Sequence, residues 1–154
     1  MKTLLAAILL ALCAAAPAAD FTPLDRGAAR ALLAHRDTAQ PTVVALWASD
    51  CSYCKQNLRT LAGLARTHPR LRIVTVTVAA ERPSALTQPE LDKTGVPGER
   101  YAYADDVPEA LAYAIDPNWR GELPRTYLFD ARGGVQAVSG TLDAAGFRTA
   151  LKLK

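Results

Sequence analysis

The chain has 154 residues, half of them hydrophobic, which is enough for one domain with its own core. Its formal net charge is +3 at pH 7 and it contains no run of five or more basic residues, so composition gives no support to nucleic-acid binding. No repeat with a period of about 20 to 50 residues is found, which excludes solenoids and propellers.

The N-terminal segment has the layout of a secretory signal. A basic start at Lys2 precedes an apolar stretch from Leu4 to Leu12, and small residues follow. The apolar stretch is shorter than the ~20 residues that a membrane-spanning helix needs. We therefore predict a signal peptide that is cleaved near Ala18 or Ala19, and a periplasmic or otherwise exported protein.

Cys13 lies inside this leader. A lipoprotein signal needs a small residue before its cysteine, and Leu12 stands there, so we interpret Cys13 as a residue lost on processing, with lipidation as the alternative. The chain then divides into a signal peptide, residues 1–18, and one domain, residues 19–154. That domain keeps two cysteines in a single motif, which argues against a disulfide-stapled scaffold.

The first element predicted in the domain is a helix over residues 23–36. Thr22 offers a capping hydroxyl, Pro23 suits the first helical position, and apolar residues recur at helical spacing from Leu24 onward. His35 falls at the end of this helix, where we expect a capping or solvated position rather than a catalytic role.

An apolar strand, Thr42 to Trp47, leads into the motif Cys51-Ser52-Tyr53-Cys54, which opens a helix that runs to about Thr67. The N–H groups at a helix start lack intrahelical partners and carry partial positive charge, so they favour a thiolate. Cys51 is therefore the predicted nucleophile. Cys54, one turn deeper, can attack a mixed disulfide at Cys51 and release the partner.

Three other uses of the cysteine pair are weaker. A structural zinc site needs further ligands, and the remaining candidates, Cys13, His35 and His68, lack ligand spacing. A c-type haem site needs a histidine where Lys55 stands. A static disulfide would close a very small loop and remove little unfolded-state entropy. His68, which precedes Pro69 at the helix end, is expected to be a cap.

The second half of the chain predicts a strand parallel to the first, a loop-rich insert, a hairpin and a last helix. The insert carries one large aromatic residue, Trp119, which we expect to pack in its loop rather than to form a platform for substrate. The predicted elements are a strand over Leu71 to Val78, a helix over Pro83 to Lys93, a turn at Gly95 to Gly98, a strand over Arg100 to Ala104, a helix over Val107 to Ala114, a loop over Asp116 to Gly121, strands over Pro124 to Asp130 and Val135 to Ser139, and a helix over Asp143 to Leu153.

Two segments, Trp47 to Lys55 and Leu123 to Gly133, resemble the thioredoxin superfamily, and within it the exported TlpA/ResA-like branch. The likeness covers most of residues 40–154. It implies an α/β protein with the thioredoxin fold, in which helices flank a central mixed β-sheet and an insert precedes the cis-proline strand. It also implies that Pro124 is cis and faces the cysteine pair, whereas an ordinary proline at a strand start is the alternative.

The same resemblance implies a surface that binds partner proteins. The backbone at Leu123, beside Pro124, is expected to pair with an extended segment of the partner. The other substrate-binding candidates are Trp47, Ser52 and Tyr53.

Two acidic residues that relatives use are missing from this chain. Ala45 stands where thioredoxin has a buried aspartate, and Asn57 stands where ResA-like proteins often have a glutamate. Those acids help to deprotonate the resolving thiol, so Cys54 must use water, Lys55 or an acid from elsewhere. The candidate acids are Glu81, Asp105, Asp106 and Glu122.

Two further positions depart from the family pattern. Arg59 replaces a helix-kinking proline. Asp50 stands where many relatives have tryptophan, and its negative charge opposes thiolate formation at Cys51, unless it serves as the helix N-cap.

Together these features predict an enzyme, an exported thiol-disulfide oxidoreductase that works as a reductant through Cys51 and Cys54. The redox-active disulfide is the only cofactor expected, with no metal. The expected partners are cysteine-containing exported proteins and a membrane thiol-disulfide electron donor or acceptor, with no nucleic acid. The alternative is a non-catalytic binding module or copper carrier of this fold that uses the two thiols as soft ligands.

Overall fold

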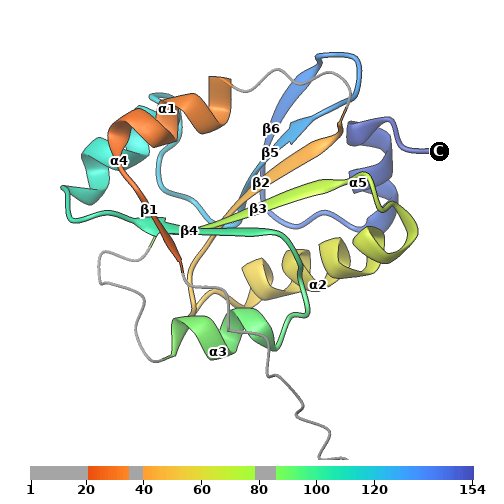
Figure 1. Cartoon of the computed structure of the whole chain (residues 1–154), viewed down its shortest axis with the longest axis horizontal. Helices are drawn as coiled ribbons and strands as arrows, with labels where there is room; N and C mark the ends of the chain where they lie inside the picture. Colours follow the sequence, from red (N-terminus) through yellow and green to blue (C-terminus); the bar gives the residue numbers. More distant parts are fainter. Residues whose placement is uncertain (1–20, 35–39, 79–85) are drawn as a thin grey trace, which may run out of the picture.

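The computed structural model describes residues 21–34, 40–78 and 86–154. A six-stranded sheet with the order β1-β4-β3-β2-β5-β6 forms its centre (Figure 1). β1, β4, β3 and β2 pair in parallel, whereas β5 is antiparallel to β2 and β6 is antiparallel to β5. The strands are β1 (Thr22–Leu24), β2 (Thr42–Trp47), β3 (Arg72–Thr77), β4 (Glu99–Tyr103), β5 (Arg125–Phe129) and β6 (Val135–Ser139).

Helices cover both faces of the sheet (Figure 1). One face, called the α2 face below, carries α2 (Ser52–Thr67), α3 (Thr87–Asp92) and α5 (Ala144–Leu151). The opposite face, called the α1 face, carries α1 (Arg26–Ala34) and α4 (Pro108–Ile115). The predicted α/β fold with a central mixed sheet flanked by helices is confirmed.

Strand β2 explains why the sheet needs cover on both sides. Every residue of β2 is buried. Successive side chains of a strand point to opposite faces, so Val43, Ala45 and Trp47 join the core under α2, while Val44 and Leu46 join the core under α1 and α4. A strand that is apolar on both faces belongs in the middle of such a sheet.

The prediction of a first helix over residues 23–36 is wrong at its start. Thr22–Leu24 form the short edge strand β1, and α1 begins only at Arg26. Pairing with β4 and full burial of Leu24 outweigh the local capping signal, and an edge strand tolerates proline. Asp25 supplies the cap instead, since its Oδ1 accepts a hydrogen bond from the backbone N–H of Ala28 at 2.7 Å. His35 lies outside the described residues.

The later elements lie close to their predicted positions. The helix predicted over residues 83–93 begins at Thr87, and residues 83–85 lie outside the described residues. The turn before β4 contains Gly98 with a φ of +105°, and a Cβ there would collide with the carbonyl oxygen of Ile73. A glycine is therefore required at this turn.

The insert between α3 and β5 adds β4, α4 and a loop to the sheet edge and the α1 face. Trp119 in that loop is buried, packs against the core under α4 and donates from Nε1 to the carbonyl oxygen of Glu122 at 2.8 Å. The prediction that Trp119 packs in its loop is confirmed.

The predicted signal peptide lies within residues 1–20, outside the described residues, so the leader and the domain boundary remain predictions. Within the described ranges, no helix is both long enough and apolar enough to cross a membrane.

Candidate redox site

A disulfide joins Cys51 and Cys54 at the N-terminus of α2, with an S–S distance of 2.06 Å and a Cα–Cα distance of 5.2 Å. Cys51 is the N-cap of the helix, and its Sγ accepts a hydrogen bond from the backbone N–H of Cys54 at 3.1 Å. Cys51 is partly exposed, whereas Cys54 is only 1% exposed. Cys51 Sγ, the more accessible sulfur, is therefore also the one that accepts a hydrogen bond from a helix N–H group.

The second sequence motif meets the cysteines at the same edge of the sheet. β5 begins at Arg125, which lies opposite Leu46 near the end of β2, so Pro124 lies where β2 leads into the cysteine loop. The Leu123–Pro124 peptide bond is cis. Leu123 is partly buried and packs against the same core cluster as Cys51. The cis bond is the one that the resemblance implies.

The other substrate-binding candidates separate by exposure. Ser52 and Tyr53 are exposed, and Tyr53 has 65% of its surface open to solvent. Trp47 is 0% exposed and belongs to the core under α2, so the prediction that it contacts a partner is wrong. The strand periodicity explains the error, because Trp47 shares its face of β2 with Val43 and Ala45.

The described candidate acids do not form a group around Cys54. Asp105 is exposed. Asp106 accepts two hydrogen bonds from the guanidinium of Arg26, at 2.6 and 2.7 Å. Glu122 is exposed and accepts from the hydroxyl of Ser139 at 2.6 Å. Glu81 lies outside the described residues.

Asp50 is not the N-cap of α2. The cap is Cys51, and Asp50 is exposed beside it. The interpretation of Asp50 as a cap is therefore wrong, and the expectation that its charge opposes thiolate formation at Cys51 remains open to test.

Glu90 on α3 is the acid that the sequence did not single out. Lys55 Nζ, one residue after Cys54, donates to Glu90 Oε2 at 2.9 Å and to the carbonyl oxygen of Ser49 at 3.1 Å, and Lys93 Nζ donates to Glu90 Oε1 at 2.6 Å. The hydrogen bonds from Lys93 and Lys55 lower the pKa of Glu90 to about 2. Glu90 is thus ionised near neutral pH and holds Lys55 over the loop before Cys51.

Asn57 ties the cysteine helix to the segment before α5. Its Nδ2 donates to the carbonyl oxygen of Gly140 at 3.2 Å, and its Oδ1 accepts from the backbone N–H of Leu142 at 3.0 Å. Both ends of this buried amide bind backbone groups. Asn57 therefore holds the cysteine helix to the segment before α5 through two hydrogen bonds to backbone groups.

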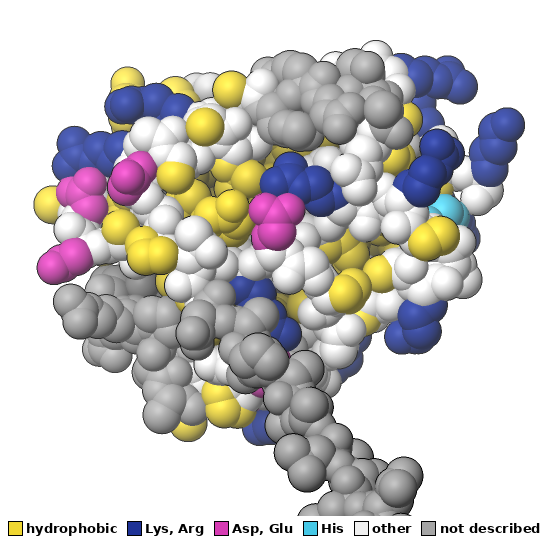
Figure 2. Space-filling model, in the orientation of Figure 1, with side chains coloured by type: hydrophobic (Ala, Val, Ile, Leu, Met, Phe, Trp, Pro, Cys, Tyr) yellow, Lys and Arg dark blue, Asp and Glu magenta, His cyan; other side chains and the backbone are white. Residues whose placement is uncertain are grey.

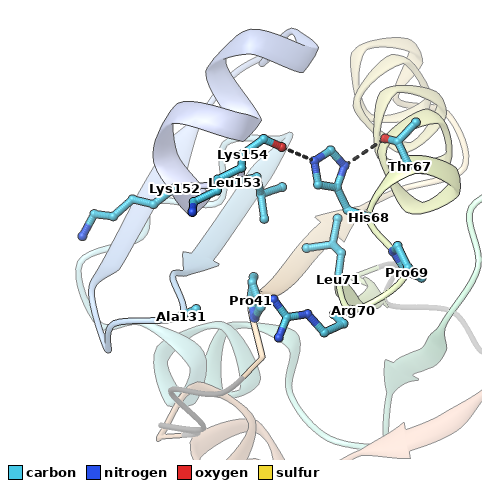
Figure 3. A pocket seen from close by; sticks show the side chains of 10 residues that line it. All are labelled: Pro41, Thr67, His68, Pro69, Arg70, Leu71, Ala131, Lys152, Leu153 and Lys154. Atoms are coloured by element: carbon cyan, nitrogen blue, oxygen red, sulfur yellow. Dashed lines mark hydrogen bonds between the residues drawn. The ribbon is translucent and has the colours of Figure 1, made fainter.

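A cavity of about 380 Å³ lies at the other end of α2 and shows the role of His68 (Figure 3). His68 is the C-cap of α2; its Nδ1 lies 2.8 Å from Thr67 Oγ1 and its Nε2 lies 3.1 Å from the carbonyl oxygen of Lys154. The 16 residues of α2 lie between Cys51, its N-cap, and His68, its C-cap, so His68 is at the opposite end of the helix from the disulfide. The prediction that His68 is a helix cap is confirmed.

The surface of the molecule is unevenly charged. Figure 2 shows several lysine and arginine side chains at the end that carries α5 and the C-terminus, whereas acidic and basic side chains lie together toward the end that carries α4. The cavity at the C-terminal end of α2 shares this basic character, since Arg70, Lys152 and Lys154 are among its lining residues (Figure 3). Among the described residues, no group of three or more His, Cys, Asp or Glu side chains is placed to hold a metal ion.

Comparison with known proteins defines the fold. No protein-family model and no curated protein matches the chain. Similar solved structures include a secreted disulfide oxidoreductase of Mycobacterium tuberculosis homologous to E. coli DsbE, with a TM-score of 0.59 and 17% identity over 75% of this chain and 83% of that chain. A DsbF homologue of Corynebacterium diphtheriae has a TM-score of 0.59 and 16% identity over 78% and 74%. StoA of Bacillus subtilis has a TM-score of 0.53 and 17% identity over 72% and 81%.

These structures share the fold over about three quarters of this chain and differ from it in most residues. The chain therefore has the thioredoxin fold, as the resemblance of its two motifs implied, and a cysteine pair joined by a disulfide lies at the start of its α2.

Proposed function

We propose that this protein is an exported thiol-disulfide oxidoreductase that exchanges disulfides with partner proteins. The observation that carries the proposal is the asymmetry of the cysteine pair. Cys51 is partly exposed and receives the N–H of Cys54 at 3.1 Å, whereas Cys54 is buried behind it. An accessible sulfur with a hydrogen-bond donor at a helix N-terminus suits a nucleophile, and a covered sulfur within disulfide distance suits a resolving group.

The exchange proceeds in two substitutions at sulfur. The Cys51 thiolate attacks a disulfide of the partner, forms a mixed disulfide and releases one partner thiolate. The Cys54 thiolate then attacks Cys51 Sγ, forms the Cys51–Cys54 bond and releases the second partner thiolate. The partner gains two electrons, which this protein loses, and the reverse sequence oxidises a partner.

We propose that the partner binds as an extended segment along Leu123 and touches the exposed side chains of Ser52 and Tyr53. Leu123 lies at the sheet edge that carries the cysteines, next to the buried Pro124. A backbone pairing of this kind accepts many sequences, which suits an enzyme that acts on several cysteine-containing exported proteins.

We further propose that the protein works as a reductant outside the cytoplasm and receives electrons from a membrane thiol-disulfide donor. The leader-like residues 1–18 support export, and so does the likeness in fold to a secreted disulfide oxidoreductase of M. tuberculosis. The resemblance of the two motifs to the TlpA/ResA-like branch supports the reducing direction.

Two cysteine variants test the proposed exchange. Cys51→Ser is expected to abolish disulfide exchange, and Cys54→Ser is expected to accumulate mixed disulfides, because it attacks partners without resolving them. Non-reducing electrophoresis of the protein incubated with a disulfide-containing substrate reads both outcomes. The proposal would be refuted if the wild-type protein showed no exchange and Cys54→Ser trapped no partner.

The reduction potential of the pair tests the direction. Equilibration in defined thiol buffers is expected to give a value towards the roughly −270 mV of thioredoxin. A value towards about −120 mV would make the protein a disulfide donor instead.

A further inference from the structure

On the sheet beneath the cysteine helix, two residues with hydroxyl groups flank Ala45, the residue that the sequence comparison placed where thioredoxin has a buried aspartate. Ala45 on β2 lies opposite Thr75 of β3 on one side and opposite Thr126 of β5 on the other. Their Cα atoms belong to neighbouring strands, about 4.8 Å apart. Alternation along each strand places these three side chains on the α2 face, since Ala45 packs in the same core cluster as Cys54.

The two threonines beside Ala45 are equally buried but differ in their hydrogen bonds. Each is 1% exposed. Thr75 Oγ1 donates to the carbonyl oxygen of Glu99 at 3.2 Å. Thr126 Oγ1 has no hydrogen-bond partner within the described ranges, and neither has Thr77 Oγ1, one pleat further along β3. A buried hydroxyl in this state calls for an explanation, because native structures rarely leave one unpaired.

Cys54 is the group nearby whose needs change during the reaction. In the disulfide it requires no hydrogen bond, but after reduction it becomes a buried thiol, and burial in apolar surroundings disfavours the thiolate. The charged groups next to it along the chain and on α3 are already engaged or exposed: Lys55 binds Glu90, and Asp50 is exposed. Among the described residues of this face, three buried neutral donors lack a partner, Trp47 Nε1, Thr77 Oγ1 and Thr126 Oγ1, and of these Thr126 lies directly opposite Ala45.

We propose that the Thr126 hydroxyl is a positioning group for the resolving cysteine, which donates a hydrogen bond to the Cys54 thiolate in the reduced protein. The inference rests on the proposed disulfide exchange. In the step it assists, Cys54 loses its proton to water, its thiolate attacks Cys51 Sγ of the mixed disulfide, the Cys51–Cys54 bond forms, and the partner sulfur leaves with the electron pair of the broken bond. The hydroxyl stabilises the thiolate without a charge of its own, so the thiol titrates without a coupled carboxylate.

The test compares two threonines that flank the same alanine. Thr126→Val keeps the shape and removes the hydroxyl, Thr126→Ser keeps the hydroxyl, and Thr75→Val is the matched control because its hydroxyl serves Glu99. The readout is the pH midpoint of Cys54 in the reduced protein, from the ¹³Cβ chemical shift of labelled cysteine, assigned with Cys51→Ser and Cys54→Ser.

Thr126→Val is expected to raise the Cys54 midpoint by about one pH unit, which is a roughly tenfold lower thiolate fraction below the midpoint. Thr126→Ser and Thr75→Val are expected to stay near the wild-type value. Equal midpoints for Thr126→Val and wild type, or equal shifts for Thr126→Val and Thr75→Val, would overturn the proposal. If Thr126→Val does not fold, Thr126→Ala and Thr126→Ser make the same comparison, since both lack the methyl group and only one lacks the hydroxyl.

The measurement separates this proposal from the proposed function. Wild-type exchange is measured in parallel with an insulin-type disulfide substrate. Absent exchange with an intact Thr126 effect would refute the oxidoreductase reading alone, whereas normal exchange without a Thr126 effect would refute the positioning role alone.

Discussion

The two faces of the sheet handle polar groups in different ways, although they share the same strands. On the α2 face, the row beneath the cysteine helix carries a methyl group and two hydroxyls, from Ala45, Thr75 and Thr126. On the α1 face, the neighbours of Thr126 along β5 join an ion pair, because Arg125 binds Asp116 at 2.7 Å and the Tyr127 hydroxyl donates to the same carboxylate at 3.1 Å.

The cluster on the α1 face keeps fixed protonation states near neutral pH. Burial raises the pKa of Tyr127 to about 12, which keeps its hydroxyl a donor. Burial opposes ionisation of Asp116, but hydrogen bonds from the Asn118 backbone, Arg125 and Tyr127 outweigh it, and the pKa of Asp116 is lowered. This ion pair thus lies across the sheet from the thiols. Beneath Cys54, the α2 face offers neutral groups that do not titrate with it.

Cavities in either core test whether the two faces form one cooperative unit. Leu58 on α2 and Leu111 on α4 are both almost fully buried, in the clusters of opposite faces. Leu58→Ala and Leu111→Ala are each expected to lower the free energy of unfolding by about 2 to 5 kcal/mol, from lost burial and the cavity left behind. Urea unfolding followed by circular dichroism measures both. A biphasic transition in Leu111→Ala would show that the α1 face unfolds separately, contrary to this expectation.

Breaking the ion pair on the α1 face is expected to cost less. Arg125 and Asp116 have side chains only 13% and 16% exposed, and the Arg125 guanidinium also lies 5.1 Å from the centre of the Tyr127 ring. Arg125→Met leaves Asp116 without its cation, so we expect a loss of about 2 to 3 kcal/mol, somewhat below the value for a fully buried pair. The matched control is Arg26→Met, which breaks the more exposed pair with Asp106 and should change the unfolding midpoint little. Equal losses in the two variants would contradict the distinction.

Much of the fold could be predicted from the sequence because the strongest signals are local and periodic. β2, α2 and the hairpin of β5 and β6 follow from apolar runs, a helical stripe and a glycine turn. The short strand β1 could not be predicted, because Thr22 and Pro23 satisfy helix-start rules and only the distant β4 makes them a strand. Pairing between segments far apart in sequence overrides weak local preferences.

The candidate site shows the same division. The cysteine motif and the proline motif identified its centre, and their meeting at one sheet edge was implied by resemblance. Trp47 was misjudged because a residue next to a motif can still face the core. The contact between Lys55 and Glu90 crosses from α2 to α3 and has no local signal, although Glu90 and Lys93 have the helical spacing that favours a pair. The missing hydrogen-bond partner of Thr126 could not be predicted, because it depends on how β5, β2 and β3 pair in the folded sheet.

The pH dependence of stability tests the far end of the α2 face, where a charge is buried. Asp130 lies at the end of β5 and pairs with Lys152. The hydrogen bond from Lys152, followed by those from the backbone N–H groups of Gly134 and Arg132, lowers the pKa of Asp130 to about 2. An acid whose pKa is lower in the folded state stabilises the fold above its unfolded pKa, near 4, and loses that effect as pH falls towards 2.

Asp130→Asn is therefore expected to be less stable than wild type from about pH 5 to pH 7, with a difference that shrinks below pH 4. Urea unfolding at a series of pH values measures it. Lys152→Met retains the carboxylate and the backbone donors. Its free energy of unfolding should change less with pH than that of wild type. A difference for Asp130→Asn that is constant down to pH 2 would mean that the carboxylate contributes through shape rather than charge.

The smallest expected effect comes from Lys55 on the α2 face. It is tested by comparing Lys55 with Lys93, since both lysines bind the Glu90 carboxylate. Lys55 and Lys93 both bind Glu90, but only Lys55 also donates to the carbonyl oxygen of Ser49, two residues before Cys51. Lys55→Met releases that loop and should slow disulfide exchange by less than about fivefold, because partly exposed ion pairs contribute little. Lys93→Met removes a lysine from the same acid and should leave the rate near wild type.

The pH profile distinguishes the anchoring of the loop from a direct effect on the thiols. The pKa of Glu90 is about 2, so the contact with Lys55 persists throughout the range in which thiols titrate. The ratio of the Lys55→Met rate to the wild-type rate is therefore expected to stay constant from about pH 5 to pH 8. A ratio that changes across this range would show that the charge of Lys55 acts on the cysteine thiolates themselves. A charged side chain of the α2 face would then influence the ionisation of the cysteines.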